Sequence, residues 1–305
     1  MSAITTIIRR AVWSKTLFEF WQRLGVNVTR KHFSSPIPDT RELAKRQNLW
    51  SEESTLPGLD MNVEGQLRLL EKIFPKYKDE LDFPVDKADN PHGYYMNNAG
   101  YGFEDAAVLH CMIRHFKPKT IIEVGAGYST FASARASVMN QQEGHATRLI
   151  AVEPYPREAL RKGFPGLDRL IIRKAEQMDV SFFDQLGEND ILFIDTSHVM
   201  RIGNDVNFLY LEVLPRLQKG VVVHIHDIFF PHHYSREQII DNRAFWSEQY
   251  LLQGFLCFNS AYEVLFGNHY MLSKYPERIR AVFTRPQGCR PHNPNSFWIR
   301  KKVKK

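Results

Sequence analysis

Short apolar runs alternate with longer amphipathic segments from residue 103 to the end of the chain. The apolar runs predict strands at residues 120–124, 148–153, 170–173, 190–195, 220–226, 262–266 and 296–300. The segments between them have the apolar spacing of helices, at about 104–116, 129–140, 156–162, 204–214 and 235–256, with one break allowed in the last. Strands that alternate with helices predict an α/β fold, namely a doubly wound, mostly parallel sheet of seven strands with room for an antiparallel strand near the end.

The chain begins with a different pattern, which predicts a helix at residues 4–24. Apolar side chains recur there at mixed three- and four-residue spacing, and basic residues interrupt them. The segment has no continuous hydrophobic region, so it does not resemble a signal peptide. Such an amphipathic helix can dock on its own domain, pack against a partner subunit in a homo-oligomer, or lie on a membrane surface.

The next segments predict a second helix and a long loop. The helix is expected at residues 63–74 and ends before Pro75. Residues 81–102 are rich in Pro, Asn, Gly and Tyr, so we expect a loop over the mouth of the main domain. We therefore expect a helical N-terminal extension with a lid-like loop at 1–91 and the main domain at 92–305. Four side chains of the loop are candidates for lid and substrate contacts, namely Tyr94, Tyr95, Asn97 and Asn98.

Composition and charge exclude several classes of protein. The chain has 305 residues, of which 43% are hydrophobic and 24% charged, so it can bury a core without disulfides or a structural metal. Its three cysteines show no Cys-x-x-Cys spacing, which favours a reducing, cytoplasmic location. Residues 1–33 and residues 300–305 each carry a net charge of +5, which leaves −4 for the rest of the total of +6. The acidic body argues against nucleic-acid binding, whereas the basic ends favour contact with an anionic membrane surface.

A glycine pair and two carboxylates follow the first two strands of the main domain. Gly125 and Gly127 allow a tight turn and a close approach to a ligand, but Thr130 stands where a dinucleotide fingerprint has its third glycine. Glu123 would repel a pyrophosphate and suits a cationic ligand. Glu153 ends the second strand, where a carboxylate can accept both hydroxyls of a ribose. These features predict a nucleoside with a positive group and no phosphates, and S-adenosylmethionine fits that description.

The same segments resemble the class I S-adenosylmethionine-dependent methyltransferases, in the branch called methyltransferase family 24. The resemblance covers roughly residues 92–300 and is strongest at residues 116–130, 151–156, 190–198 and 223–231. It implies that Glu123, Gly125 and Gly127 line the methionine moiety of S-adenosylmethionine and that Glu153 binds its ribose. It further places Ala175 and Glu176 near the adenine. The remaining members of the implied cofactor site are Ala126, Tyr128, Ser129 and Asp195.

Two clusters of acids and histidines follow the fourth and fifth strands. Asp195 ends the fourth strand, and His198 comes three residues later; His224, His226 and Asp227 lie at or just beyond the fifth. Adjacent parallel strands bring both clusters to one edge of the sheet, over the methyl group of the cofactor. The two-residue period of a strand predicts that His224 and His226 point to one face and Asp227 to the other.

Two mechanisms fit these clusters. In the first, Asp195, His226 and Asp227 bind Mg²⁺ or Mn²⁺, which lowers the pKa of an acceptor hydroxyl, as in the metal-dependent O-methyltransferases that the sequence resembles. In the second, His198, oriented by Asp195, is the general base and no metal is needed. The two are compatible, and the expected catalytic residues are Asp195, His198 and His226.

We therefore expect a cytoplasmic S-adenosylmethionine-dependent methyltransferase (EC 2.1.1.-). Its acceptor is expected to be a small hydroxylated molecule, such as a sugar or a natural product, methylated on oxygen. One alternative is an NAD(P)-dependent oxidoreductase, against which Thr130 and Glu123 both argue. Another is a non-catalytic S-adenosylmethionine-binding protein that its basic ends recruit to a membrane or a partner.

Overall fold

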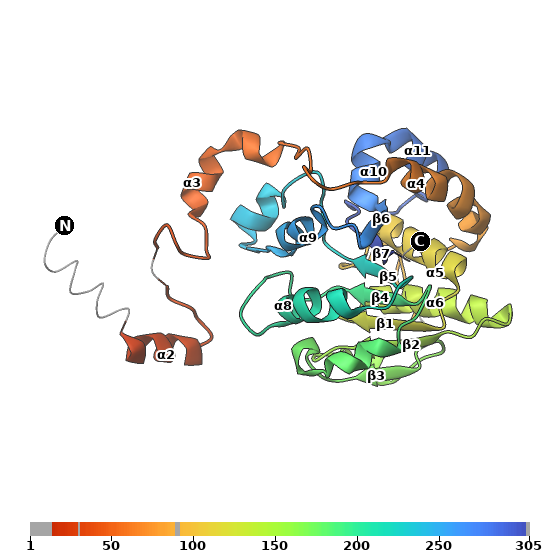
Figure 1. Ribbon diagram of the computed structural model, residues 1–305, viewed down its shortest axis with the longest axis horizontal. Helices are drawn as coiled ribbons and strands as arrows, with labels where there is room; N and C mark the ends of the chain where they lie inside the picture. Colours follow the sequence, from red (N-terminus) through yellow and green to blue (C-terminus); the bar gives the residue numbers. More distant parts are fainter. Residues whose placement is uncertain (1–13, 30, 89–91, 303–305) are drawn as a thin grey trace, which may run out of the picture. The chain divides into compact units, whose positions relative to one another are not determined.

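All seven predicted strands form in the computed structural model, which describes residues 14–29, 31–88 and 92–302. They make one sheet in the order β3-β2-β1-β4-β5-β7-β6 (Figure 1). The first five pair in parallel, and β7 lies antiparallel between β5 and β6. The prediction of a doubly wound, mostly parallel sheet is thereby confirmed. The strands are β1 Thr120–Val124, β2 Arg148–Val152, β3 Arg169–Ile171, β4 Ile191–Ile194, β5 Val222–Ile225, β6 Tyr262–Gly267 and β7 Phe297–Lys301.

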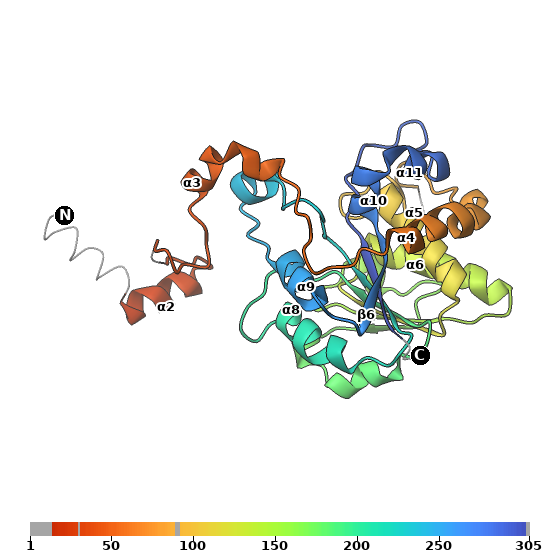
Figure 2. The same ribbon diagram turned by 45° about the horizontal axis from the view of Figure 1, so that its top comes forward.

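The sheet separates two hydrophobic cores, because alternate strand residues face opposite sides. Ile121 and Ile191 belong to one core, and their neighbours Ile122 and Leu192 belong to the other. Figure 2 shows α5 and α6 on the opposite side of the sheet from α8 and α9. The helices of the first side are α4 Val63–Arg68, α5 Phe103–Phe116, α6 Tyr128–Gln142, α7 Glu158–Arg161, α10 Asn268–Lys274 and α11 Pro276–Val282; those of the second are α8 Asp205–Phe208 and α9 Glu248–Leu256.

Shorter turns of helix complete the connections of the sheet. Two π-helical segments continue α4 and α8, which confirms helical structure over the predicted ranges 63–74 and 204–214. The expected stop before Pro75 is wrong, because a 3-10 helix begins at Phe74 and places the proline in its first turn, where no N–H group is needed. These segments are η2 Leu69–Ile73, η3 Phe74–Glu80, η4 Ala175–Gln177, η5 Val180–Gln185, η6 Leu209–Val213 and η7 Leu214–Arg216.

The helix predicted at 235–256 is interrupted over several residues. A single π-helical turn, η8, spans Glu237–Asp241, and α9 begins only at Glu248. The backbone N–H groups of Ser247 and Glu248 donate to the carbonyl oxygen of His198, at 2.8 and 3.1 Å, instead of continuing a helix from residue 241. The break therefore has a tertiary cause that a local pattern does not contain.

The chain divides into two compact units, one formed by residues 1–51 and 234–245 and the other by residues 52–233 and 246–305. The first unit contains α2 Lys15–Arg23, capped by Ser14, and α3 Thr40–Lys45, capped by Asp39 and lying beside η8, with η1 Gln47–Trp50 after it. α2 is the described part of the helix predicted at 4–24, whose first ten residues lie outside the described chain. The expected boundary after residue 91 and the membrane or partner contact of the first helix stay predictions.

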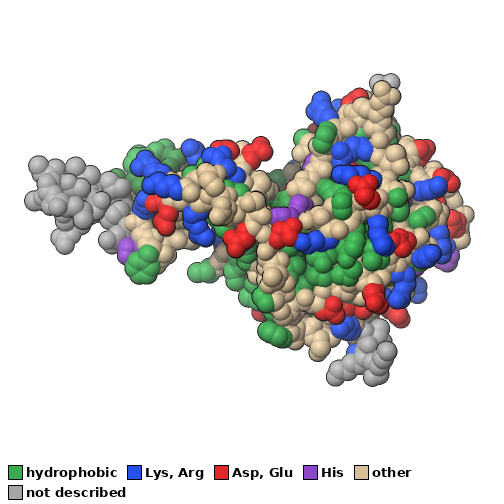
Figure 3. Space-filling view, turned by 90° about the horizontal axis from the view of Figure 1, so that it is seen from above, with side chains coloured by type: hydrophobic (Ala, Val, Ile, Leu, Met, Phe, Trp, Pro, Cys, Tyr) green, Lys and Arg blue, Asp and Glu red, His purple; other side chains and the backbone are tan. Residues whose placement is uncertain are grey.

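Two further features concern the charged surface of the second unit and the helices of the chain. Acidic and basic side chains are interspersed over the face of the second unit that Figure 3 shows. Among the described residues, no helix has the length and apolar character that a membrane crossing requires.

Candidate active site

The carboxyl ends of β1, β2, β4 and β5 meet at one edge of the sheet, and the loops that follow them are tied together by backbone hydrogen bonds. The N–H group of Gly125 donates to Val152 (2.9 Å), that of Asp195 to Val124 (2.9 Å) and that of His226 to Ile194 (3.0 Å). Each loop therefore leaves the sheet in register with its neighbour. This edge is where ligands bind in doubly wound sheets.

The loop after β1 is shaped by its two glycines in different ways. Gly125 has a φ of +86°, a conformation that side chains with a Cβ rarely adopt. Gly127 precedes the first residue of α6, and its N–H group donates to Thr130 Oγ1 at 3.0 Å, so Thr130 caps the start of this helix. The threonine that replaces the third glycine of a dinucleotide fingerprint thus has a defined local role.

Glu123 lies beneath this loop rather than in an open cavity. It is fully buried, and its Oε1 accepts hydrogen bonds from the hydroxyls of Ser129 (2.5 Å) and Thr130 (3.0 Å). Burial raises the pKa of Glu123 to about 8, although both hydroxyls act in the opposite direction. Glu123 and Ser129, both expected in the cofactor site, therefore bond to one another and support the glycine loop from below.

A polar cavity of about 380 Å³ opens beside the loop, at the ends of β1, β2 and β4. Five of the predicted cofactor residues line it, namely Gly125, Glu153, Ala175, Glu176 and Asp195. Glu153 also holds the rim, because its Oε2 accepts from Ala126 N–H at 3.2 Å and its Oε1 from Tyr155 N–H at 2.7 Å. Polar lining residues that sequence reasoning missed are Lys174, Thr196, Ser197, Arg201, Asn204 and Asp205.

The predicted residues Gly127 and Tyr128 line a different, smaller cavity of about 200 Å³. There the guanidinium of Arg157 lies 4.8 Å above the ring of Tyr128, and the hydroxyl of Tyr128 lies 3.0 Å from that of Tyr95. The structure therefore does not bring Gly127 and Tyr128 into the lining of the polar cavity. Their predicted contact with the cofactor stays a prediction.

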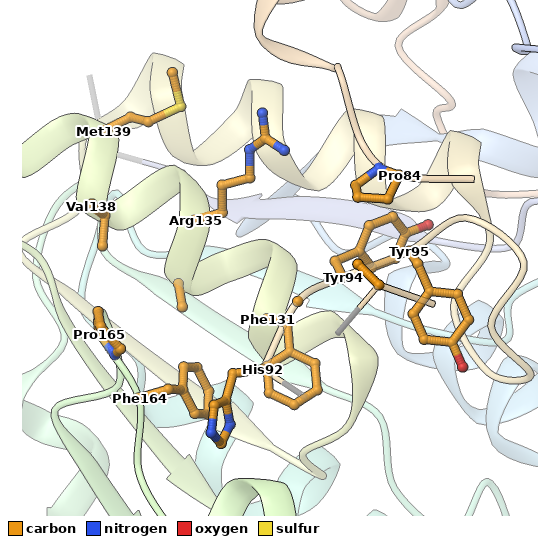
Figure 4. Close-up of a pocket in the computed structure, with 13 residues that line it drawn as sticks. Pro84, His92, Tyr94, Tyr95, Phe131, Arg135, Val138, Met139, Phe164 and Pro165 are labelled. Atoms are coloured by element: carbon orange, nitrogen blue, oxygen red, sulfur yellow. The ribbon is translucent and has the colours of Figure 1, made fainter. Parts of the chain in front are cut away.

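An apolar groove of about 540 Å³ runs along the outer side of α6 (Figure 4). Phe131, Arg135 and Met139 of α6 form one wall, and Tyr94 and Tyr95 stand opposite, near Pro84. His92 stacks on Phe164 at the other end, with ring centroids 5.5 Å apart. Its lining holds no acid and a single histidine, His92, so the groove offers no cluster of acids and histidines like that at the ends of β4 and β5.

The loop that was expected to act as a lid is held by its own polar side chains. Tyr94 is buried and donates to the carbonyl of Tyr101 at 3.0 Å. Asn98 donates to Tyr95 and Tyr101 carbonyls and accepts from two N–H groups, and Asn97 bonds to Asp86. These contacts hold residues 94–101 in place. Tyr94 and Tyr95 line the apolar groove, and Tyr95 also lines the smaller cavity beside Tyr128. The lid function stays a prediction.

Two carboxylates and a histidine converge at the ends of β4 and β5. His198 Nε2 lies 3.3 Å from Asp195 Oδ1 and 3.2 Å from Asp227 Oδ2. Potential ligand atoms of Asp195, His198 and Asp227 all lie within 4.8 Å of one another, the one such group of three found among the described residues. Asn295 fixes Asp227 by donating to its Oδ1 at 2.8 Å. The structure thus groups His198 with the two carboxylates, and the predicted metal-binding role of His226 stays a prediction.

His226 lies next to this cluster and faces a second buried acid. Its Nδ1 is 3.6 Å from the carboxylates of both Asp195 and Asp227, and its Nε2 is 3.9 Å from Asp105 Oδ2. The prediction that Asp227 points away from His226 is wrong, because the strand ends at Ile225 and Asp227 has a φ of 59°. His224 lies in the core, where it stacks on Phe193 with ring centroids 3.9 Å apart.

The electrostatics of the cluster favour charged forms. Burial alone would lower the pKa of His198, but Asp195, Glu248 and Asp227 outweigh it and raise that pKa to about 10. Asp195, Asp227 and Asp105 hold the pKa of His226 well above its usual value despite burial. Desolvation would raise the pKa of Asp195, yet the two histidines keep it below its usual value.

Sequence reasoning missed two buried acids of this region, Asp105 and Glu248. Both are fully buried; Asp105 lies in α5, where it accepts from the backbone of Ser296 (2.9 Å), and Glu248 begins α9. Both acids lie in the first turn of a helix beside a polar neighbour, where an exposed acid is ordinary, so the sequence carried no signal of their burial.

Similar solved structures include two O-methyltransferases. One is TomG from Streptomyces achromogenes, involved in tomaymycin synthesis and solved in complex with SAM; it is 15% identical, with 77% of this chain and 90% of that chain covered and a TM-score of 0.36. The other, from Bacillus cereus and solved in complex with SAH, is also 15% identical, with 77% and 91% covered and a TM-score of 0.34.

Sequence comparisons match the sheet and its strand-end loops. Residues 122–228 match the model of a family described as a methyltransferase domain. An uncharacterized protein of Archaeoglobus fulgidus is 34% identical over 166 residues, which make up 52% of this chain and 74% of that protein. The family match runs from β1 to just beyond β5, so it includes both the glycine loop and the cluster of Asp195, His198 and Asp227.

Proposed function

Because the chain belongs to the class I S-adenosylmethionine-dependent methyltransferases, we propose that it transfers the methyl group of S-adenosylmethionine to a hydroxyl oxygen of a small acceptor. One observation carries this proposal: Asp195 both lines the polar cavity and belongs to the cluster with His198 and Asp227. The methyl donor in the cavity and the acceptor hydroxyl at the cluster would then lie next to one another at Asp195. The family membership also decides against the oxidoreductase alternative.

The polar cavity suits S-adenosylmethionine in charge as well as in position. Its lining has four carboxylates and two cationic side chains, which favours a ligand with an ammonium and a sulfonium group. Glu153 has a lone pair left on each oxygen beside its two backbone hydrogen bonds, so both hydroxyls of a ribose can bind there. Ala175 and Glu176 would lie beside the adenine, and Gly125 beside the methionine moiety.

Asp195, His198 and Asp227 fit a divalent cation. Two carboxylate oxygens and one imidazole nitrogen are ligands that Mn²⁺ and Mg²⁺ accept, with the histidine favouring Mn²⁺. The other ring nitrogen of His198 bonds a carboxylate, Glu248, as metal-bound histidines usually do. Such a cation would lower the pKa of an acceptor hydroxyl and fix its place.

The chain's own residues would align the acceptor and exclude water. Methyl transfer is an in-line displacement, so the oxygen must approach the methyl carbon opposite the sulfur. The C–O bond would form as the C–S bond breaks, S-adenosylhomocysteine would leave, and a carboxylate of the cluster would take the hydroxyl proton. Asp195 and Asp227 would accept the hydroxyl hydrogen bond, and Asn295 holds Asp227 in place for that contact. Positioning of this kind can supply roughly 7–11 kcal/mol of a barrier in favourable cases.

Labelled methyl transfer tests the proposal. The protein would be incubated with S-adenosylmethionine carrying a tritiated methyl group and a panel of phenols, catechols and sugars, with chelator, Mg²⁺ or Mn²⁺. We expect label on oxygen, loss of transfer in chelator and recovery with metal. Full transfer in the presence of chelator would contradict the requirement for a divalent cation and would leave the mechanism in which His198 is the base without a metal. Tight cofactor binding with no transfer to any acceptor would favour the non-catalytic alternative, and label on nitrogen alone would contradict the oxygen acceptor.

A further inference from the structure

His198 is held by three consecutive residues at the start of α9. The carbonyl oxygen of His198 accepts hydrogen bonds from the N–H groups of Ser247 (2.8 Å) and Glu248 (3.1 Å). The Ser247 hydroxyl oxygen accepts from Met200 N–H at 2.9 Å, and the ring of Trp246 lies against the imidazole with centroids 4.5 Å apart. The histidine has a φ of 58°, an unusual conformation for a residue with a Cβ, so this backbone needs such support.

The side chain of Glu248 completes the arrangement. Its Oε2 lies 2.9 Å from His198 Nδ1, and the carboxylate is only 1% exposed. Removing a carboxylate from water is costly unless a charged or hydrogen-bonding partner compensates. Among the described residues, His198 is the one cationic group that forms an ion pair with Glu248. A leucine in this position would avoid the desolvation of a carboxylate, so packing alone gives no reason for an acid.

We propose that Glu248 is a positioning residue for His198: it accepts the Nδ1–H hydrogen bond and thereby turns Nε2 of the same ring toward Asp195 and Asp227. With the proton fixed on Nδ1, the nitrogen beside the two carboxylates is the one available to a cation or to a proton. Glu248 lies outside the lining of the polar cavity, so it touches the reaction only through His198. This inference rests on the proposed function in taking Nε2 as the working nitrogen.

Nuclear magnetic resonance of the metal-free protein tests the hydrogen bond directly. With ¹⁵N-labelled histidine, H198Q identifies the His198 signals among those of the 12 histidines. We expect a proton on Nδ1 of His198 with the downfield shift of a strong hydrogen bond in the wild type, its loss in E248L and its retention in E248Q, because a glutamine oxygen still accepts. A proton on Nε2 alone, or an unchanged Nδ1–H signal in E248L, would overturn the proposal.

Calorimetric titration with Mn²⁺ tests the consequence. E248L should lower the Mn²⁺ affinity about 10- to 100-fold and leave the affinity for S-adenosylhomocysteine unchanged, and E248Q should restore most of the loss. The matched control is E104Q, which removes another buried carboxylate, paired with Arg285; it should affect unfolding but not Mn²⁺ affinity. Equal Mn²⁺ affinity in wild type and E248L would overturn the proposal. If the wild type binds no Mn²⁺, the cation site of the proposed function is wrong. The role of Glu248 is then decided by the nuclear magnetic resonance result alone.

Discussion

The carbonyl oxygen of Asp195 occupies the space that a side chain on Gly125 would need. A Cβ atom built on Gly125 would lie 1.6 Å from that oxygen, far inside any real contact. The glycine loop after β1 and the acid that follows β4 are therefore packed backbone to backbone. This contact is what places the carboxylate of Asp195 at the boundary between the polar cavity and the cluster with His198.

Replacing Gly125 with alanine should destabilise the protein strongly. The left-handed backbone alone costs about 1–2 kcal/mol for a residue with a Cβ, and the clash with Asp195 adds to it because backbone must move. At roughly 2–4 °C per kcal/mol for a domain of this size, the melting temperature should fall by several degrees or more. G254A is the matched control: Gly254 lies inside α9, its Cβ would meet nothing within 4 Å and alanine favours a helix, so the melting temperature should equal or slightly exceed that of the wild type. Equal stability of the two variants would contradict this packing.

Replacing Glu153 with alanine should weaken binding of S-adenosylhomocysteine. A hydrogen bond to a charged group contributes about 1.5–3 kcal/mol, so we expect roughly a 10- to 100-fold loss of affinity by calorimetry. The expected loss combines the hydrogen bonds of Glu153 to the ribose with the hydrogen bond that Glu153 accepts from Ala126 N–H at the rim of the cavity. E158A, which removes an exposed acid of α7, should bind like the wild type. Unchanged affinity in E153A would remove Glu153 from the cofactor site.

Replacing Glu123 with glutamine should change the dependence of stability on pH. The pKa of this carboxyl is about 8 in the folded protein and 4.5 in an unperturbed glutamate, so folding favours its protonated form. Its contribution to stability is complete below pH 4.5 and is lost as the pH rises through about 8. Glutamine cannot ionise and still accepts from Ser129 and Thr130, so E123Q should gain stability over the wild type as the pH rises from 5 to 9. If the melting temperatures of the two proteins changed with pH in the same way between pH 5 and 9, Glu123 would not be a buried carboxyl group with a raised pKa.

Local patterns were sufficient to predict the strands, because the central parallel strands β1, β4 and β5 are buried throughout and so appear as continuous apolar runs. They also placed Glu153 and Asp195 in one cavity, since the carboxyl ends of parallel strands share an edge. The position of β7 between β5 and β6 depends on pairing between distant segments, which spacing along the chain does not contain. The close approach of His198 to both carboxylates was not predicted for a similar reason. It depends on left-handed backbone at His198 and Asp227 and on Glu248, 50 residues further along the chain.

Thermal unfolding with S-adenosylmethionine, S-adenosylhomocysteine and NAD, each with and without Mn²⁺, tests the central claim most directly. A ligand at 100 times its Kd adds about 2.7 kcal/mol of stability, which corresponds to roughly 5–10 °C for a domain of this size. We expect a shift of that size with the two S-adenosyl ligands, a further rise with Mn²⁺ that D227N abolishes, and no shift with NAD. A shift with NAD alone, or no shift with either S-adenosyl ligand, would contradict the account.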